Sequence, residues 1–292
     1  MMSARKTLLL TALAMLAFAA NSLLCRLALQ QPTIDPASFG AVRLAAGAVT
    51  LGLVVRLRRP PAVAARGDWL AATMLFGYVA FFSFAYLSLS AGTGALILFG
   101  AVQLTMFGVG LYGGERFRAA AWAGLALALA GLVVLVAPGL TAPPLLGALS
   151  MGLAGIAWGV YSLRGRGVTD PIGATAGNFF RAAPLAVALA VALALMGQAR
   201  ANATGLALAV ASGAVTSGLG YVVWYAALAG LSSLRAATVQ LSVPVIAAFA
   251  GVLFLGEAIT PRLALASLAI VGGIALVLTS RAGPRECASA DS

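Results

Sequence analysis

Ten long apolar runs divide this chain, and they constrain its fold more than any other feature of the sequence. Each holds about 17 to 25 residues, enough for a helix to cross a hydrocarbon layer roughly 30 Å thick. The connections are short, so we expect neighbouring helices to run antiparallel in one bundle. The runs are Thr7–Leu29, Ala37–Val55, Trp69–Ser90, Thr93–Leu111, Ala119–Val136, Leu145–Leu163, Ile172–Met196, Gly205–Leu228, Ala236–Leu255 and Leu263–Thr279.

The composition excludes a water-soluble fold. Hydrophobic residues make up 62% of the chain and charged residues only 9%, whereas soluble domains carry about a quarter charged residues. Helix-capping residues stand ahead of four of the runs, at Asp35-Pro36, Asp68, Asp170-Pro171 and Thr260-Pro261. The sequence therefore predicts an all-α polytopic membrane protein with ten transmembrane helices.

The chain has no histidine, which removes the usual proton shuttle and the commonest metal ligand. It also excludes H-E-x-x-H metallopeptidases and Ser-His dyads, and no Walker A sequence occurs. We therefore expect no cofactor, no metal ion and no enzymatic activity, with a membrane-embedded enzyme as the alternative of another class.

The basic residues predict how the helices are oriented. With the N-terminus inside, thirteen Lys and Arg residues between the runs fall on the cytoplasmic side, and only Arg200 and Arg262 fall on the other. This bias accounts for the net charge of +11 without a nucleic-acid partner. It places the chain in the bacterial inner membrane with both termini cytoplasmic.

The first run also has the features of a secretory signal peptide, with Arg5 and Lys6 before an apolar core and a cleavage-like Ala17-Phe18-Ala19. Two observations favour a transmembrane helix instead. The apolar stretch continues to Leu29, and the segment has a counterpart later in the chain.

That counterpart belongs to an internal repeat, in which five landmarks recur in order. Since each unit holds five spans, an odd number, the second unit must lie upside down in the membrane, as in many secondary transporters. We expect inverted repeats at residues 1–140 and 141–280 and a polar cytoplasmic tail at 281–292. The paired landmarks are Ala12–Met15 with Ala148–Met151, Asp35-Pro36 with Asp170-Pro171, Gln103-Leu104 with Gln240-Leu241, Gly114-Glu115 with Gly256-Glu257, and Gly131–Leu135 with Gly273–Val277.

These features resemble the EamA-type branch of the drug/metabolite transporter superfamily, and within it the YddG-type amino-acid exporters. The resemblance implies an outer ring that includes the fifth and tenth helices and a central cavity lined mainly by the others. The two halves of the chain are not strictly symmetric at one place. The segment from Gln103 to Glu115 is five residues shorter than its counterpart from Gln240 to Glu257.

Three arginines lie inside apolar runs, where each costs on the order of 3 kcal/mol at the bilayer centre. Arg26 is expected to be an anchor at the membrane interface. Arg43, six residues into its run, suits either a headgroup contact or a binding site. Arg181 lies deeper, with Asn178 one turn earlier. We expect Arg181 to face the cavity and attract a substrate carboxylate, or else to bond backbone carbonyls and hold helices together.

Aromatic and neutral polar residues complete the predicted site. The aromatic side chains would form an apolar wall with π faces for an ammonium group, and the polar ones would offer hydrogen bonds to a zwitterion. Each could instead serve helix packing. The aromatic candidates are Trp158, Tyr78, Tyr86 and Phe99, and the polar ones are Asn21, Gln240 and Ser242.

The function expected from the resemblance is broad, alternating-access export of amino acids, aromatic and other neutral ones included, and of related small metabolites. Proton coupling usually needs an acid or histidine within the spans, and none is present; this favours facilitated or exchange transport. A carrier of drugs or nucleotide-linked sugars is the alternative within the superfamily. The expected partners are the lipid bilayer and the small-molecule substrate; the oligomeric state stays open, and a monomer would suffice.

Overall fold

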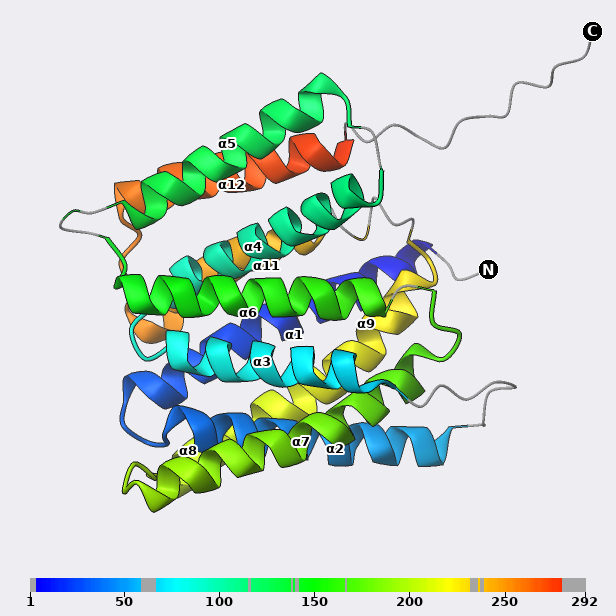
Figure 1. Ribbon diagram of the computed structural model, residues 1–292, viewed down its shortest axis with the longest axis vertical. Helices are drawn as coiled ribbons and strands as arrows, with labels where there is room; N and C mark the ends of the chain where they lie inside the picture. The colour runs from blue at the N-terminus through cyan, green and yellow to red at the C-terminus, as the bar shows by residue number, and fades with distance from the viewer. Residues whose placement is uncertain are drawn as a thin grey trace, which may run out of the picture.

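The structure is a computed structural model that describes residues 4–58, 67–114, 117–137, 139, 142–165, 167–231, 236 and 239–279. These residues form ten helical rods packed side by side (Figure 1). Among them the structure contains no β-strand, and Ile34 and Ala201 form one isolated bridge between two connections. The prediction of an all-helical bundle is confirmed for this part of the chain.

The helices follow the predicted runs closely. The eighth rod is one continuous helix made of α8, a π-helical segment η1 and α9. In chain order the helices are α1 (Ala4–Gln30), α2 (Pro36–Leu57), α3 (Trp69–Ala85), α4 (Ala91–Tyr112), α5 (Ala119–Val136), α6 (Leu145–Arg164), α7 (Pro171–Leu195), α8 (Ala203–Ala211), η1 (Ser212–Leu219), α9 (Gly220–Leu228), α11 (Ser242–Leu255) and α12 (Pro261–Thr279).

Eight of the described rods are long and apolar enough to cross a membrane. The other two, α3 with 17 residues and α11 with 14, are shorter than the runs from which they were predicted. α3 ends at Ala85 because the chain turns there before Ser90 caps α4. Before Ser242 the predicted ninth span has two residues, 237 and 238, outside the described residues, and Leu241 is the N-cap of α11.

Aspartates cap the helices as predicted, and two of them also join α2 to α7. Asp35 accepts hydrogen bonds from the N–H groups of Ala37 and Ser38 at the start of α2, and from Arg200 beyond the end of α7. Asp170 caps α7 and pairs with Arg58, beyond the end of α2, at 2.6 Å. Partial burial alone would raise the pKa of Asp35, but these hydrogen bonds outweigh it and hold the pKa below its ordinary value.

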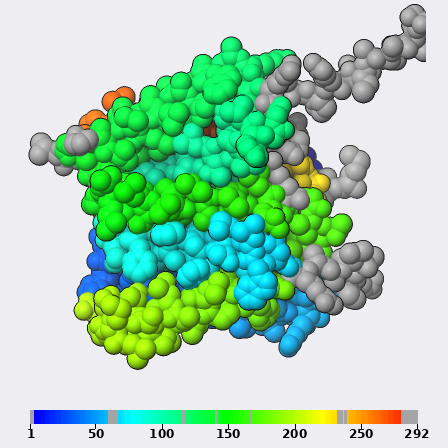
Figure 2. Space-filling model, viewed as in Figure 1, coloured from blue at the N-terminus to red at the C-terminus, as the bar shows by residue number. Residues whose placement is uncertain are grey.

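The helix neighbours form a consistent set of pairs. α5 packs along α12 at one side of the molecule (Figure 1), and α2 packs along α7. α3 contacts α6 and α7, while the rod of α8, η1 and α9 contacts α1 and α2. α6 and α11 both contact α4, and α1 contacts α11. Figure 2 shows α3 (cyan), α6 (green) and α7 (yellow-green) forming one continuous face.

Large apolar side chains cover the outside of this bundle. Leu146, Leu195, Leu253 and Leu268 are each at least 74% exposed, as expected of side chains that contact lipid. In a bilayer the lipid tails are as apolar as leucine, so helices associate through close packing and not through the hydrophobic effect. The α5–α12 pair achieves this packing with glycines.

Two adjacent glycines of α12 allow a test of that packing. A Cβ atom at Gly273 would lie 2.5 Å from the carbonyl oxygen of Gly124 in α5, whereas one at Gly272 would meet nothing within 4 Å. We expect Gly273→Ala to force the helices apart and to destabilise the protein by about 1–3 kcal/mol. Gly272→Ala should be neutral or stabilise by up to about 1 kcal/mol, because alanine favours a helix. Thermal unfolding of the purified protein in detergent measures both; equal effects would contradict the packing argument.

Candidate functional site

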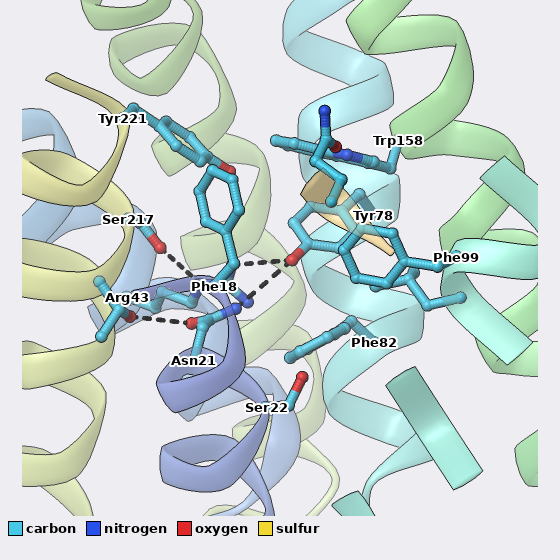
Figure 3. Close-up of a pocket in the computed structure, with 13 residues that line it drawn as sticks. Phe18, Asn21, Ser22, Arg43, Tyr78, Phe82, Phe99, Trp158, Ser217 and Tyr221 are labelled. Carbon is cyan, nitrogen blue, oxygen red and sulfur yellow. Dashed lines mark hydrogen bonds between the residues drawn. The ribbon is translucent and has the colours of Figure 1, made fainter. Parts of the chain in front are cut away.

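One cavity lies among the central helices. Its walls come from both halves of the chain (Figure 3). The lining residues are Phe18, Asn21 and Ser22 of α1, Arg43 of α2, Tyr78 and Phe82 of α3, Leu98 and Phe99 of α4, Trp158 of α6, Thr216 and Ser217 of η1, Tyr221 of α9, and Gln240.

Arg43 supplies the positive charge of this cavity. Its side chain is only 1% exposed, Nε donates to Ser217 Oγ at 3.2 Å, and one terminal nitrogen, Nη2, donates to the Tyr78 hydroxyl at 3.2 Å. The guanidinium carbon lies 5.2 Å and 5.1 Å from the ring centres of Tyr78 and Phe82. None of the ion pairs between described residues includes Arg43, so aromatic faces and neutral hydroxyls surround its charge.

The other terminal nitrogen, Nη1, is buried and has no hydrogen-bond partner among the described residues. A buried charged donor left unpaired costs far more than an exposed one. The site is therefore suited to receive an anionic oxygen at this nitrogen, next to the cavity.

A hydrogen-bonded network connects α1, α3 and η1 beside Arg43. Asn21 Nδ2 donates to the Tyr78 hydroxyl at 3.4 Å, and the hydroxyl of Ser212 donates to Asn21 Oδ1 at 2.6 Å. Thr216 Oγ1 is 3.2 Å from Asn21 Oδ1 and 2.8 Å from the carbonyl of Ser212. Both hydroxyl residues lie on η1, and single π-helical turns within longer helices occur often at functional sites.

Aromatic rings form the rest of the wall. The Trp158 ring centre lies 4.9 Å from that of Tyr78 and 5.6 Å from that of Tyr221. Phe18 meets Tyr221 edge to face at 5.9 Å. The cavity thus has one polar end, built around Arg43 and Asn21, and broad aromatic surfaces that suit an apolar side chain or a cation.

An ion pair lies beyond the cavity along α1. Arg26 lies one helical turn beyond Ser22, and its Nε is 3.3 Å from Glu257 Oε1, with the two side chains 15% and 11% exposed. Glu257 accepts from the N–H of Ala91 at the start of α4, where the helix dipole favours a negative charge. Arg26 also donates to the carbonyl of Tyr86 at 3.0 Å. We call Arg26 and Glu257 the latch.

The structure gives Arg26 contacts that the expectation of an interface anchor did not include. Its charge is directed inward to Glu257 and to the end of α3, and it joins α1, α3, α4 and the end of α11. Sequence reasoning missed this because Glu257 lies beyond the predicted ninth span and its distance from Arg26 in space depends on how the helices pack.

A group of neutral side chains lies beside Trp158. The Tyr161 ring stacks on Trp158 at 5.3 Å. The Tyr161 hydroxyl is 3.5 Å from Thr175 Oγ1, which is 3.0 Å from the hydroxyl of Tyr225. Further along, Arg164 pairs with Asp68 at 3.4 Å in an exposed contact.

The structure brings six of the ten predicted site residues together at the cavity: Asn21, Arg43, Tyr78, Phe99, Trp158 and Gln240. The other four do not line it. Asn178 accepts a hydrogen bond from the N–H of Asp68, Tyr86 donates to the carbonyl of Ala91, and Ser242 donates to the carbonyl of Val239. Each of these three polar groups therefore serves a local structural contact.

Arg181 is the fourth, and its position differs from the expectation. It donates to the carbonyl of Gly177 one turn earlier, and its guanidinium carbon lies 5.8 Å from the ring centre of Trp69, which is 62% exposed. The carbonyl-bonding alternative matches this geometry. The guanidinium at the cavity belongs to Arg43.

Sequence reasoning did not select seven of the lining residues, which are Phe18, Ser22, Phe82, Leu98, Thr216, Ser217 and Tyr221. The segment SGAVTSGL (Ser212–Leu219) did carry a signal, because it places two glycines among three hydroxyl residues inside an apolar run. A Cβ at Gly213 would lie 2.2 Å from the carbonyl oxygen of Arg43. Glycine there lets η1 approach α2 closely enough for Ser217 to reach Arg43.

Comparisons with known proteins agree with a membrane carrier. Residues 145–279 match the model of the EamA-like transporter family. An uncharacterized protein of Pseudomonas aeruginosa is 57% identical over 279 residues, covering 96% of each chain. A solved crystal structure shares the fold with a TM-score of 0.64 at 22% identity, over 96% of this chain and 99% of that one.

The latch can be tested with a native thiol. Cys25, the residue before Arg26, is fully buried, and Cys287→Ser would leave it as the one thiol of the chain. We expect Glu257→Gln to remove the ion pair, to open the packing around Cys25 more often and to raise the rate of Cys25 alkylation by a small maleimide at least about tenfold, which corresponds to about 1.4 kcal/mol. Mass spectrometry of timed samples measures the rate.

Arg164→Gln is the matched control, because it removes the exposed pair with Asp68. Exposed pairs contribute little, so the alkylation rate should stay within about twofold of the starting protein. Equal rates in Glu257→Gln and Arg164→Gln would show that the latch does not control access to Cys25.

Proposed function

Because this chain belongs to the EamA-like transporter family of the drug/metabolite transporter superfamily, we propose that it exports amino acids and related small metabolites. The substrates would cross the inner membrane by alternating access and with broad selectivity. The cavity is the substrate site in this proposal. It lies between elements of both halves of the chain, where carriers of this kind hold their substrates.

The observation that carries the proposal is the unpaired Nη1 of Arg43. Every amino acid has a carboxylate, and a guanidinium binds a carboxylate through short, charge-assisted hydrogen bonds. Since no acidic side chain pairs with Arg43 among the described residues, a substrate carboxylate would be its first counter-ion. It would offset part of the cost of burying the charge.

The aromatic walls support a substrate with more than a carboxylate. Trp158, Tyr221 and Phe18 offer ring faces and edges that suit an apolar or aromatic side chain and attract an ammonium group. Seven of the thirteen lining residues are aromatic or leucine. Broad selectivity for neutral amino acids follows, because apolar contacts discriminate weakly between side chains.

The helix neighbours support the two-repeat organisation that alternating access would use. In chain order the helices of residues 1–140 correspond to those of 141–280: α1 to α6, α2 to α7, α3 to the rod of α8, η1 and α9, α4 to α11, and α5 to α12. When each helix is exchanged with its counterpart, the α3–α6 contact becomes the contact of the rod with α1. The α4–α6 contact likewise becomes α11–α1, and the pairs α5–α12, α2–α7 and α4–α11 map onto themselves. In our proposal these units are inverted repeats, and residues 281–292 are a cytoplasmic tail.

In this proposal the distribution of Lys and Arg residues decides how the protein is oriented in the membrane. With both termini in the cytoplasm, the latch lies on the outer side of the cavity and opens to release substrate. The predicted absence of proton coupling is retained, because the chain has no histidine and the cavity lining contains no acid. Transport would then be facilitated or by exchange.

The test is uptake of radiolabelled amino acids into proteoliposomes with and without unlabelled amino acid inside. We expect saturable uptake that internal amino acid accelerates. Arg43→Gln should lower the apparent affinity at least about tenfold, because a hydrogen bond to a charged group contributes about 1.5–3 kcal/mol. Arg43→Lys should recover part of the loss, since lysine keeps the charge without the planar donor pair.

Arg181→Gln is the matched control, because it removes a guanidinium that lies outside the cavity. Its uptake should remain within about twofold of the unmodified protein. No uptake of any amino acid by well-folded protein would contradict the proposed substrate class and direct the search to drugs or nucleotide-linked sugars. Equal losses in Arg43→Gln and Arg181→Gln would contradict the role given to Arg43.

A further inference from the structure

The Tyr78 hydroxyl is a second feature of the polar end of the cavity, and its hydrogen bonds decide where its proton points. We propose that this hydroxyl and Arg43 Nη1 form a two-donor clamp for a carboxylate, and that Asn21 is the positioning residue that directs the hydroxyl proton toward the bound carboxylate. The proposal rests on the proposed function, because it concerns the same site, and it names the group by which that site selects its substrates.

The orientation of the Asn21 carboxamide follows from its neighbours. The Ser212 hydroxyl lies 2.6 Å from Asn21 Oδ1, and Thr216 Oγ1 lies 3.2 Å from the same atom. These hydroxyls come from η1, so the π-helical turn holds the amide oxygen on its own side. The NH₂ group of Asn21 is consequently directed to Tyr78, at 3.4 Å from the hydroxyl.

Tyr78 therefore receives two donors. Asn21 Nδ2 donates to its oxygen, and so does Nη2 of Arg43 at 3.2 Å. A guanidinium only donates, and a phenolic oxygen has one proton and a limited capacity to accept. With both neighbours donating, the proton of Tyr78 cannot point at either of them. It is left for an acceptor in the cavity, which Tyr78 lines (Figure 3).

Two lining residues thus each hold a donor without an acceptor. Nη1 of Arg43 has no partner among the described residues, and the Tyr78 proton is left for the cavity by its neighbours. A carboxylate has two acceptor oxygens and can satisfy both donors at once. A primary amide has a single acceptor oxygen and would present its NH₂ group to the other donor. The clamp therefore selects acids over their amides, and a site with buried donors rejects a ligand that leaves one unpaired.

The experiment measures binding by the purified full-length protein in detergent, so it does not depend on transport. Dissociation constants are obtained from the shift in unfolding temperature for leucine and leucinamide and for phenylalanine and phenylalaninamide. At about pH 6, below the pKa of an α-amino group, both members of each pair carry the ammonium group and the same side chain, so the ratio of the two constants reports the carboxylate.

We expect the unmodified protein to bind each acid at least about tenfold more tightly than its amide. Tyr78→Phe should weaken acid binding about tenfold, in line with a lost hydrogen bond to a charged group, and should change amide binding less than about twofold. Tyr225→Phe is the control, because it removes a hydroxyl that lies 3.0 Å from Thr175 Oγ1, and neither residue lines the cavity. It should leave the acid-to-amide ratio unchanged.

A double-mutant cycle tests the positioning role of Asn21. Asn21→Leu removes the donor to Tyr78 without adding a charge, and should weaken acid binding about threefold with little change for the amide. In the Tyr78→Phe background it should have no further effect on the ratio. Additive losses would show that Asn21 acts on its own and would overturn the positioning role.

The two proposals fail in different ways. An acid-to-amide ratio that Tyr78→Phe leaves unchanged would overturn the clamp, whatever the protein transports. If Tyr78→Phe reduces the preference for the acid as expected but proteoliposomes take up no amino acid, the clamp is upheld and amino acids are overturned as the exported class.

Discussion

Inside the hydrocarbon layer no water is available to bond a backbone amide or carbonyl, and this constraint shapes every part of the bundle. A helix satisfies these groups internally, which is why the described spans are helices along their lengths. Because lipid does not drive apolar helices together, their association depends on close approach. Gly124 and Gly273 bring α5 and α12 together in this way, and Gly213 brings η1 against the backbone at Arg43.

The same constraint determines where polar side chains can go. At the helix ends Asp35 and Asp170 satisfy free N–H groups and hold the opposite ends of α2 and α7. In the interior each polar group needs a hydrogen-bond partner. Ser83 finds one in the carbonyl of Val79 in its own helix, whereas Arg43 finds neutral partners on other helices in Ser217 and Tyr78. The protein thus maintains a buried charge with incomplete compensation. A binding site can use such a charge, because a ligand that completes the compensation gains more there than it would in water.

The helices, their caps and the identity of the family were predictable because each depends on local sequence. Apolar length determines a span, and an aspartate before a proline marks a helix start whatever surrounds it. Which side of each helix faces the interior could not be predicted in the same way. These helices are apolar on nearly all sides, so no polar or apolar face distinguishes the inward side. Arg181 lies deeper in its run than Arg43 and looked the better site residue. In the structure Arg181 faces Trp69 at the edge of the bundle, whereas Arg43 faces the cavity.

The two arginines show what each level of organisation decided. The sequence by itself determined that arginines lie inside the apolar runs and that no acid within the runs could neutralise them. The tertiary structure decided that the charge of Arg43 faces Tyr78, Asn21 and η1. That outcome depends on the rotation of α2 about its axis and on the π-helical turn of η1, and both arise from contacts between residues far apart in the chain. A sequence lists the groups that can bond, but packing brings Arg43 and Ser217, 174 residues apart, within 3.2 Å.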